Sequence, residues 1–440
     1  MAGAALLSPL HAQDLPLAEY AAHRAAARAR MKPHSVAVFR SAQEFPRTAS
    51  SDFPFRQANN LLYLTGYTEQ FGTLVLFADS VTVGAARATG VLFVRQRDRG
   101  RELWNGARLG PAEAAQTLGI ATLPSDSLDA VLGRALSAAE TLYYDWISDG
   151  AQDALPLKFK FTGREQEKDL KEKFPSIAKV MGTGVLTDSL RSIKSDAEIA
   201  LMQKAIDASC RGHHAAERAA KSGMFEYELA AEFDRAIEAA GAEALAYPDI
   251  VGSGPNACTL HYESNRRKIE PHELVLMDCG AEYHGYAADV TRTFPVDGTF
   301  TAEQRAIYAL VLKAQSEGIA MVKPGAPMNV AHMKALEVIT EGLHTLGILS
   351  ADSSVRRYFP HGTSHTLGLD VHDTRGGDTL RTGMVITVEP GIYVPAESPC
   401  DRKWWNIGVR IEDDVLVTRD GNRVLSDCIP KSIKELEGRE

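Results

Sequence analysis

The strongest constraint on the fold is a pattern of helix, helix and sheet that occurs twice in the C-terminal part of the chain. Two helical stretches, at about residues 196–221 and 227–241, precede strand-rich sequence through Pro295. Two more, at residues 302–322 and 328–347, precede a second strand-rich tail. This internal repeat predicts two similar half-domains that share a cleft.

Each pair of helices starts at a capping box, Ser195 with Glu198 for the first pair and Thr301 with Gln304 for the second. In this motif two side chains satisfy backbone N–H groups that the start of a helix leaves without partners. The two boxes therefore define where each half-domain begins its helices.

The first 180 residues alternate short strand-like runs with helical ones. The strand-like runs read SVAVF, TLVLF and GVLFV, and a clear helical run reads PAEAAQTLG. This alternation predicts a mixed α/β domain, and a length of 440 residues fits two domains. We place an N-terminal α/β domain at residues 1–180 and a second domain at residues 181–440.

Composition excludes several classes of protein. The net charge of −9 gives no electrostatic basis for binding nucleic acid. No apolar run approaches the ~18 residues that span a bilayer, so we expect no membrane insertion. The first residues, MAGAALLSPLHAQD, lack the basic segment of a secretory signal, and the five scattered cysteines never form CxxC. We therefore expect a loosely packed N-terminus and a reducing, cytoplasmic location.

Two aspartates close strand-like segments in the first half-domain. Asp278 follows the apolar run LVLM, and Asp289 lies 11 residues later, beyond a hairpin that contains glycine. Adjacent antiparallel strands would bring the two carboxylates together. Because a buried carboxylate without a partner is costly, Asp278 needs a cation, a metal ion or a proton.

The second half-domain contains two similar glutamates. Glu389 closes GMVITVEPG, and Glu412 lies within the strand-like IGVRIEDDVLV. Each alone could be a solvent-facing strand residue. Together with His365, however, the four carboxylates balance two divalent cations and suit Mn²⁺, Co²⁺, Zn²⁺ or Fe²⁺ better than a thiolate site would. Two such ions about 3.5 to 4 Å apart activate water, so a two-metal hydrolase is our leading hypothesis.

The run FPHGTSHTLGLDVHD brings His361, His365 and His372 close together in sequence. The spacing of the first two matches the helical H-E-x-x-H zinc motif, but the catalytic Glu is missing and the intervening residues are weak helix formers. We therefore expect a loop at this position. A loop of hydrogen-bonded histidines without a catalytic role is the alternative.

These motifs carry a family resemblance. The ordered series Asp278, Asp289, His365, Glu389 and Glu412 resembles the ligand set of the pita-bread metallopeptidases, which include methionine aminopeptidase, aminopeptidase P and prolidase. The blocks most similar to the aminopeptidase P branch are IVGSGPNACTLHY, DCGAEYHGYAADVTRTFP, HGTSHTLGLDVHD, TVEPGIYV, GVRIEDD and the N-terminal FPFRQANNLLYLTGY. The resemblance implies a creatinase/prolidase-like mixed α/β domain followed by a pita-bread domain with pseudo-twofold halves.

The resemblance also implies a role for each ligand. Asp289 and Glu412 would bridge two divalent metal ions, with Mn²⁺ the expected metal and Co²⁺, Zn²⁺ or Fe²⁺ as alternatives. Asp278 would complete one ion, and His365 and Glu389 the other.

Further active-site residues follow from the same blocks. His261 and His372 match histidines that contact substrate and stabilise the tetrahedral intermediate, and His361 matches one that lines the pocket near the proline. Arg410 and Tyr393 match groups that support the carboxylates.

The implied reaction is hydrolysis of the Xaa-Pro bond at a peptide N-terminus by a metal-bridging hydroxide, with Glu389 as proton shuttle. Proline lacks an N–H, so its peptide bonds need a dedicated pocket. The expected partners are peptides with proline second and further copies of the chain, as a dimer or tetramer. The rivals are prolidase, which accepts only Xaa-Pro dipeptides, and a non-catalytic pita-bread binding module. Methionine aminopeptidase is disfavoured by the large N-terminal domain.

Within the matched blocks, a few positions differ from the family or match none of its ligands. Asn60 and Leu62 occur where the bacterial enzymes have an acid and a tryptophan near the substrate pocket. We expect Asp370 and Asp373 in turns or behind the ligands. Asp413 should face away from the ligand that precedes it, because side chains alternate along a strand.

Overall fold

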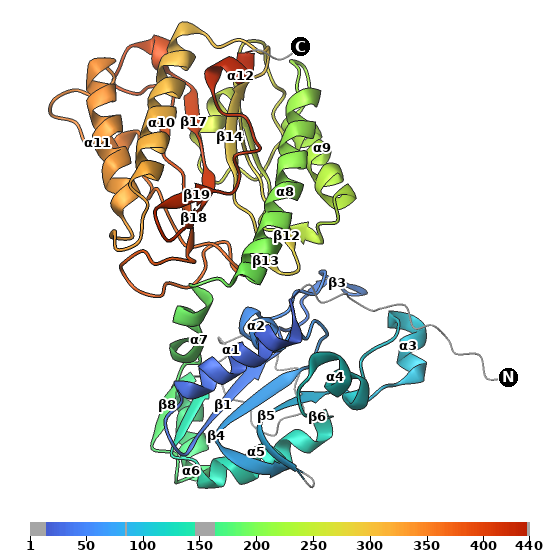
Figure 1. Ribbon diagram of the computed structural model, residues 1–440. Coiled ribbons are helices and arrows are strands. Elements are labelled where there is room, and N and C mark those ends of the chain that lie inside the picture. The colour runs from blue at the N-terminus through green and yellow to red at the C-terminus, as the bar shows by residue number, and fades with distance from the viewer. Residues whose placement is uncertain (1–14, 84–85, 146–162, 438–440) are drawn as a thin grey trace. The chain divides into compact units, whose positions relative to one another are not determined.

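The computed structural model describes residues 15–83, 86–145 and 163–437 (Figure 1). The chain forms two compact units, residues 1–190 and 191–440. The N-terminal stretch that we expected to be loosely packed lies outside the described residues.

The first unit is built on a six-stranded mixed sheet with the order β6-β5-β4-β1-β7-β8. The three predicted strands form its centre, where β4 pairs antiparallel with both β1 and β5. β7 joins parallel to β1, and β6 and β8 extend the two sides in parallel. The strands are β1 (Ser35–Arg40), β4 (Thr73–Val83), β5 (Ala86–Val94), β6 (Thr122–Pro124), β7 (Thr141–Tyr144) and β8 (Lys179–Met181).

Helices surround this sheet, as the α/β alternation predicts. The helix expected at PAEAAQTLG is α4 (Pro111–Leu118), which has proline in its first turn and ends at Gly119 in the left-handed conformation, φ 59°. The others are α1 (Leu17–Ala29), α2 (Asn59–Thr65), α3 (Arg99–Asn105), α5 (Leu128–Ala138), α6 (Gly163–Lys173) and α7 (Gly184–Arg191), with a small hairpin of β2 (Pro46–Thr48) and β3 (Ser51–Asp52).

The second unit contains the predicted repeat. Its first half has α8 (Asp196–Ala219) and α9 (Glu226–Ala239), and its second half has α10 (Ala302–Ala320) and α11 (Val330–Thr345). Both capping boxes are present: the Ser195 side chain accepts from the Glu198 N–H, and that of Thr301 accepts from Gln304. Figure 1 shows the two helix pairs on opposite sides of the strands.

The strands of the second unit form short antiparallel sheets, β10-β11-β14, β13-β12-β9, β15-β18-β19 and β16-β17. One hydrophobic cluster joins both halves, with side chains from α9, β11, α10 and β17. The strands are β9 (Ala244–Leu245), β10 (Ile250–Ser253), β11 (Leu274–Asp278), β12 (Ala281–Tyr283), β13 (Tyr286–Ala287), β14 (Thr291–Pro295), β15 (Val385–Val388), β16 (Gly391–Val394), β17 (Ile407–Arg410), β18 (Asp413–Val417) and β19 (Asn422–Val424), and α12 (Ile433–Glu437) follows.

Two expectations from the sequence are wrong in detail. Glu412 does not lie within a strand, because the chain changes sheets there: β17 pairs with β16 and β18 with β15. The second is the reducing environment expected from the scattered cysteines, which does not account for a disulfide. Cys210 on α8 and Cys428, which are 218 residues apart, form a disulfide, whereas Cys258, Cys279 and Cys400 are free.

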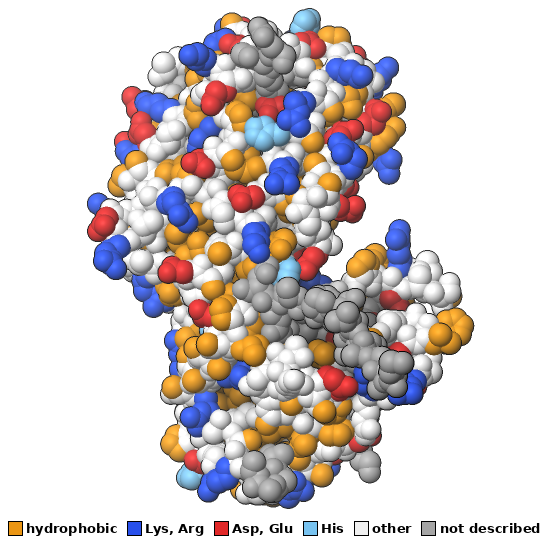
Figure 2. Space-filling model, turned by 45° about the vertical axis from the view of Figure 1, so that its right-hand side comes forward, with side chains coloured by type: hydrophobic (Ala, Val, Ile, Leu, Met, Phe, Trp, Pro, Cys, Tyr) orange, Lys and Arg blue, Asp and Glu red, His pale blue; other side chains and the backbone are white. Residues whose placement is uncertain are grey.

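The surface agrees with the composition. Figure 2 shows Lys and Arg side chains interspersed with Asp and Glu over the face in view, as on an ordinary solvated surface. Among the described residues, no helix is long and apolar enough to cross a membrane.

Candidate metal centre

The aspartates of the first half-domain meet at one end of the β11–β14 pair. Asp278 is the last residue of β11 and pairs with Thr291, and Asp289 lies just before β14. The hydroxyl of Tyr247 lies 2.7 Å from Asp278 Oδ1 and 2.7 Å from Asp289 Oδ1. The strand pairing predicted from sequence therefore does bring the two carboxylates together.

Residues of the second half-domain approach the same point. His365 Nε2 lies 3.3 Å from Asp289 Oδ2 and 3.6 Å from Glu389 Oε1. Asp289, His365 and Glu412 each offer one ligand atom, and these atoms lie within 4.8 Å of one another. Glu389 directly follows β15, and Glu412 lies between β17 and β18. All five predicted ligands thus converge on one site.

A buried arginine organises the carboxylates. Arg410 Nη2 lies 2.6 Å from Asp278 Oδ2, and Arg410 Nε donates to Thr291 Oγ1 at 3.1 Å. Thr291 in turn donates from its hydroxyl to Glu412 Oε2 at 2.6 Å. The guanidinium of Arg410 therefore orients the carboxylate of Asp278 directly and that of Glu412 through the hydroxyl of Thr291.

The same arginine begins a chain of hydrogen bonds that reaches a histidine. Arg410 Nη1 donates to the Tyr393 hydroxyl at 2.9 Å, and this hydroxyl lies 2.8 Å from His361 Nε2. His361 Nδ1 lies 2.7 Å from the carbonyl oxygen of Gly362. Burial and the charge of Arg410 lower the pKa of His361 to about 4. His361 is therefore neutral, with its Nδ1 proton donated to Gly362 and its Nε2 accepting from Tyr393.

The four predicted histidines line a cavity of about 650 Å³ beside the carboxylates. The rings of His365 and His372 are 4.0 Å apart. Burial and the neighbouring His365 lower the pKa of His372. The lining includes His261, His361, His365, His372, Glu263 and Arg375. The loop expected at the histidine run is thus confirmed, and its histidines face the cavity.

The charges of the site show what it can hold. Burial raises the pKa of Asp278, of Glu412 and of Glu389, the last to about 8. Burial lowers the pKa of His365, but the hydrogen bond and the charge of Asp289, together with the charge of Glu389, outweigh this effect and raise the pKa to about 9. The four clustered carboxylates offer more negative charge than Arg410 alone can balance. With the imidazole of His365 they form a donor set that fits divalent metal ions.

Sequence reasoning missed two residues of the site. Tyr247, in the stretch AYPDIV, makes its carboxylate contacts 31 and 42 residues away, and no local pattern marks it. Thr291 had a weak signal, because it begins a strand that follows a predicted ligand.

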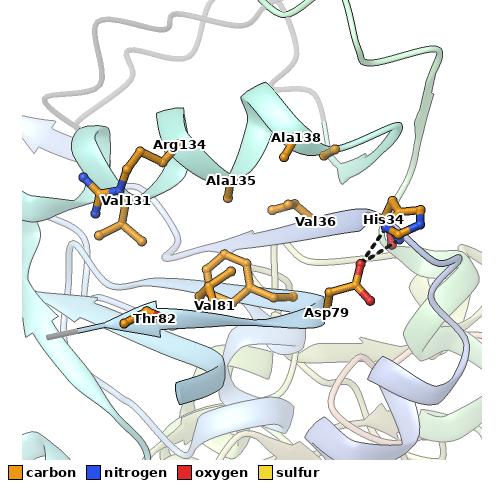
Figure 3. A pocket seen from close by; sticks show the side chains of 12 residues that line it. His34, Val36, Asp79, Val81, Thr82, Val131, Arg134, Ala135 and Ala138 are labelled. Atoms are coloured by element: carbon orange, nitrogen blue, oxygen red, sulfur yellow. Dashed lines mark hydrogen bonds and ion pairs between the residues drawn. The ribbon is translucent and has the colours of Figure 1, made fainter. Parts of the chain in front are cut away.

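A second cavity, of about 370 Å³, lies in the first unit between α5 and the strands β1 and β4 (Figure 3). Its lining includes the apolar side chains of Val36 and Phe77 from the strands and of Val131 from α5. At one end His34 Nδ1 lies 2.9 Å from Asp79 Oδ2. None of the predicted site residues lines this cavity.

Comparison with known proteins decides the family. A model of metallopeptidase family M24 matches residues 200–419, and a model of the aminopeptidase P N-terminal domain matches residues 20–143. The chain belongs to the aminopeptidase P family. The Xaa-Pro aminopeptidases of Escherichia coli K12 and Haemophilus influenzae are 34% and 36% identical to it. These matches cover 95% and 96% of this chain, and 96% and 97% of the relatives.

Solved structures of family members agree with this assignment. Proline aminopeptidase P II from Yersinia pestis matches with a TM-score of 0.87 at 34% identity, over 96% of this chain and 99% of that one. Aminopeptidase P from Pseudomonas aeruginosa matches with the same TM-score at 36% identity, over 96% of this chain and 98% of that one. The predicted mixed α/β N-terminal domain and pita-bread domain are therefore confirmed.

Proposed function

We propose that the protein is an Xaa-Pro aminopeptidase, which removes the N-terminal residue of a peptide whose second residue is proline. The observation that carries this proposal is the convergence of four carboxylates and His365 at the wall of a histidine-lined cavity. Relatives named Xaa-Pro aminopeptidase match over nearly the whole chain. An Escherichia coli aminopeptidase P structure was solved with the inhibitor Pro-Leu, which supports peptide binding in such a cavity.

We propose that the site would hold two divalent ions and that Asp289 and Glu412 would be ligands of both. Asp278 would complete one ion, and His365 and Glu389 the other. The split contacts of Asp289 support this assignment, because its Oδ1 faces Tyr247 and its Oδ2 faces His365. We propose Mn²⁺, and one Escherichia coli relative was solved with zinc substituted. When bound, such ions lower the pKa of water and polarise a carbonyl oxygen.

Side chains of the chain itself would orient the substrate and move protons. His372 and His261 line the cavity and would contact the carbonyl group of the scissile bond, while neutral His361 would face the proline side. Glu389 lies within the ligand cluster and would carry a proton from the attacking water to the leaving nitrogen. Tyr393 and Arg410 would keep His361 and the carboxylates in place.

Metal analysis tests this proposal. Protein stripped with a chelator and reloaded with Mn²⁺ should bind about two ions per chain and regain cleavage of Xaa-Pro-Yaa peptides. A matched peptide with alanine in place of proline should be cleaved far more slowly. Protein that binds no metal would favour a non-catalytic pita-bread module, and equal cleavage of both peptides would refute proline specificity.

We also propose self-association and a division of labour between the domains. Leu103 and Trp104 on α3 are 84% and 85% exposed, an unusual state for large apolar side chains and one that a neighbouring copy would relieve. We assign substrate access and oligomerisation to residues 1–180 and catalysis to residues 181–440. Light scattering of the wild type and of Trp104→Glu tests this, because the variant should dissociate.

We propose a cytoplasmic location, supported by the three free cysteines. The Cys210–Cys428 disulfide favours the alternative of an exported protein. Cell fractionation with antibody detection separates the two compartments.

A further inference from the structure

A second group of buried charges lies next to the loop that carries His372. Arg191 Nη2 lies 2.6 Å from Asp370 Oδ2 and 2.5 Å from Asp373 Oδ1. Lys194 Nζ lies 3.1 Å from Asp373 Oδ2. The side chains of Asp373 and Lys194 are each 1% exposed. Because the two acids flank His372 in sequence, the cluster holds its loop on both sides.

Backbone contacts close this loop around Asp373. The Asp373 N–H donates to the Thr366 carbonyl at 2.8 Å, and the Thr366 hydroxyl donates to the Asp373 carbonyl. Asp373 Oδ1 also accepts from the N–H of Thr374 at 2.8 Å. Thr366 follows His365 in sequence. It forms an isolated antiparallel bridge with Ile386, which lies within β15. The loop is thus tied to the segment that carries a proposed metal ligand.

Close packing leaves the ion pair little freedom. A Cβ atom at Gly368 would lie 2.1 Å from Asp373 Oδ2 and 2.9 Å from Lys194 Cε, so any other residue there would have to displace the ion pair. The Gly368 carbonyl accepts a hydrogen bond at 2.9 Å from the N–H of Ala287, which lies two residues before Asp289 in the sequence. The loop is therefore also bonded to β13, which immediately precedes the segment of Asp289.

We propose that Asp373, held by Lys194 and Arg191, is a positioning residue that fixes the imidazole of His372 at the substrate cavity. This inference rests on the proposed function, in which His372 contacts the substrate. Buried ion pairs add little stability compared with apolar side chains of similar size, so stability alone does not account for the cluster. Misplacing a catalytic group by about 1 Å can cost 10²-fold in rate, and the cluster prevents such displacement.

Enzyme kinetics on the metal-loaded protein test this role. Asp373→Asn and Lys194→Met should lower kcat for Xaa-Pro-Yaa about 10- to 100-fold at unchanged metal content. His372→Ala provides the matched background, because a residue that acts through His372 has little left to affect once the imidazole is gone. Multiplying losses in the double variant Asp373→Asn/His372→Ala would overturn the proposal.

Hydrogen exchange gives a readout that does not depend on activity. The backbone amide of residue 373 should lose protection from hydrogen exchange in Asp373→Asn and in Lys194→Met. The amides of α10 should keep their protection. Retained protection at Asp373 in both variants would overturn the proposal. If the wild type cleaves no Xaa-Pro-Yaa peptide, the proposed function fails and the exchange result alone decides the role of the cluster. Should Asp373→Asn fail to fold, Lys194→Met still carries both tests.

Discussion

Replacing Asp413 with Asn should strongly lower the free energy of unfolding and leave the metal centre in place. Asp413 follows the proposed ligand Glu412 but is 0% exposed and faces away from it. The bond partners of its carboxylate are the side chains of Arg292 at 2.7 Å, Ser426 at 2.6 Å, Gln315 at 2.5 Å and Lys431. Asn removes the charge that balances this buried arginine.

Two independent arguments set the size of the effect. Removing one partner of a buried ion pair costs about 3–5 kcal/mol. Burial alone would raise the pKa of Asp413, but Arg292 and Lys431 lower it to about 2 from an ordinary value of 3.8. That difference corresponds to roughly 2–3 kcal/mol at pH 7. Because the folded pKa is the lower one, this stability is complete above pH 4 and is lost as the pH falls toward about 2.

Glu412→Gln is the matched control, one residue away with the opposite expectation. Burial raises the pKa of Glu412, so its charge contributes no stability to the metal-free protein. This variant should keep its free energy of unfolding and lose metal binding, whereas Asp413→Asn should do the reverse.

Urea unfolding of the metal-free proteins at pH 7, together with metal titration, measures both effects. We expect Asp413→Asn to lose about 3 kcal/mol or more in the free energy of unfolding and to reach wild-type metal content at saturation. An Asp413→Asn protein of wild-type stability that binds no metal would refute the assignment of these two neighbours.

Three further predictions concern single residues. Tyr247→Phe removes the hydroxyl that bonds Asp278 and Asp289 and should weaken metal affinity about 10- to 100-fold, and an unchanged chelator titration would contradict this. Glu389→Gln should lower kcat by about 10²-fold or more with the fold retained, and near-normal turnover would defeat its role as proton shuttle. Burial raises the pKa of Asp249 to about 8, so the wild type should lose stability as the pH rises from about 4 to 8. Asp249→Asn should remove the part of this loss that Asp249 contributes, and parallel stability curves for the two proteins would exclude that contribution.

Local patterns in the sequence were enough to predict most of the elements. The capping boxes at Ser195 and Thr301 identified the starts of α8 and α10, because a cap depends on residues three positions apart. Apolar runs identified β1, β4, β5 and β11. The break at Glu412 was missed because its cause is pairing with two different strands, which no local pattern records.

The metal centre was less predictable from local patterns than the helices and strands. Buried acids at strand ends suggested a metal site, but the assignment of all five ligands came from the family resemblance. Tyr247, the Cys210–Cys428 disulfide and the Arg191–Asp373 pair could not be predicted, because each joins segments far apart in the chain. Such contacts follow from the packing of the half-domains rather than from any short motif.

The most direct test of the central claim is a mass-spectrometric time course with Mn²⁺-loaded protein, which receives an Xaa-Pro-Yaa tripeptide and an Xaa-Pro dipeptide side by side. An Xaa-Pro aminopeptidase releases Xaa from the tripeptide, and this is the result we predict. Cleavage of the dipeptide alone would identify a prolidase and would direct attention to Asn60 and Leu62 in the N-terminal block. Release of Xaa from neither peptide would contradict the proposed function.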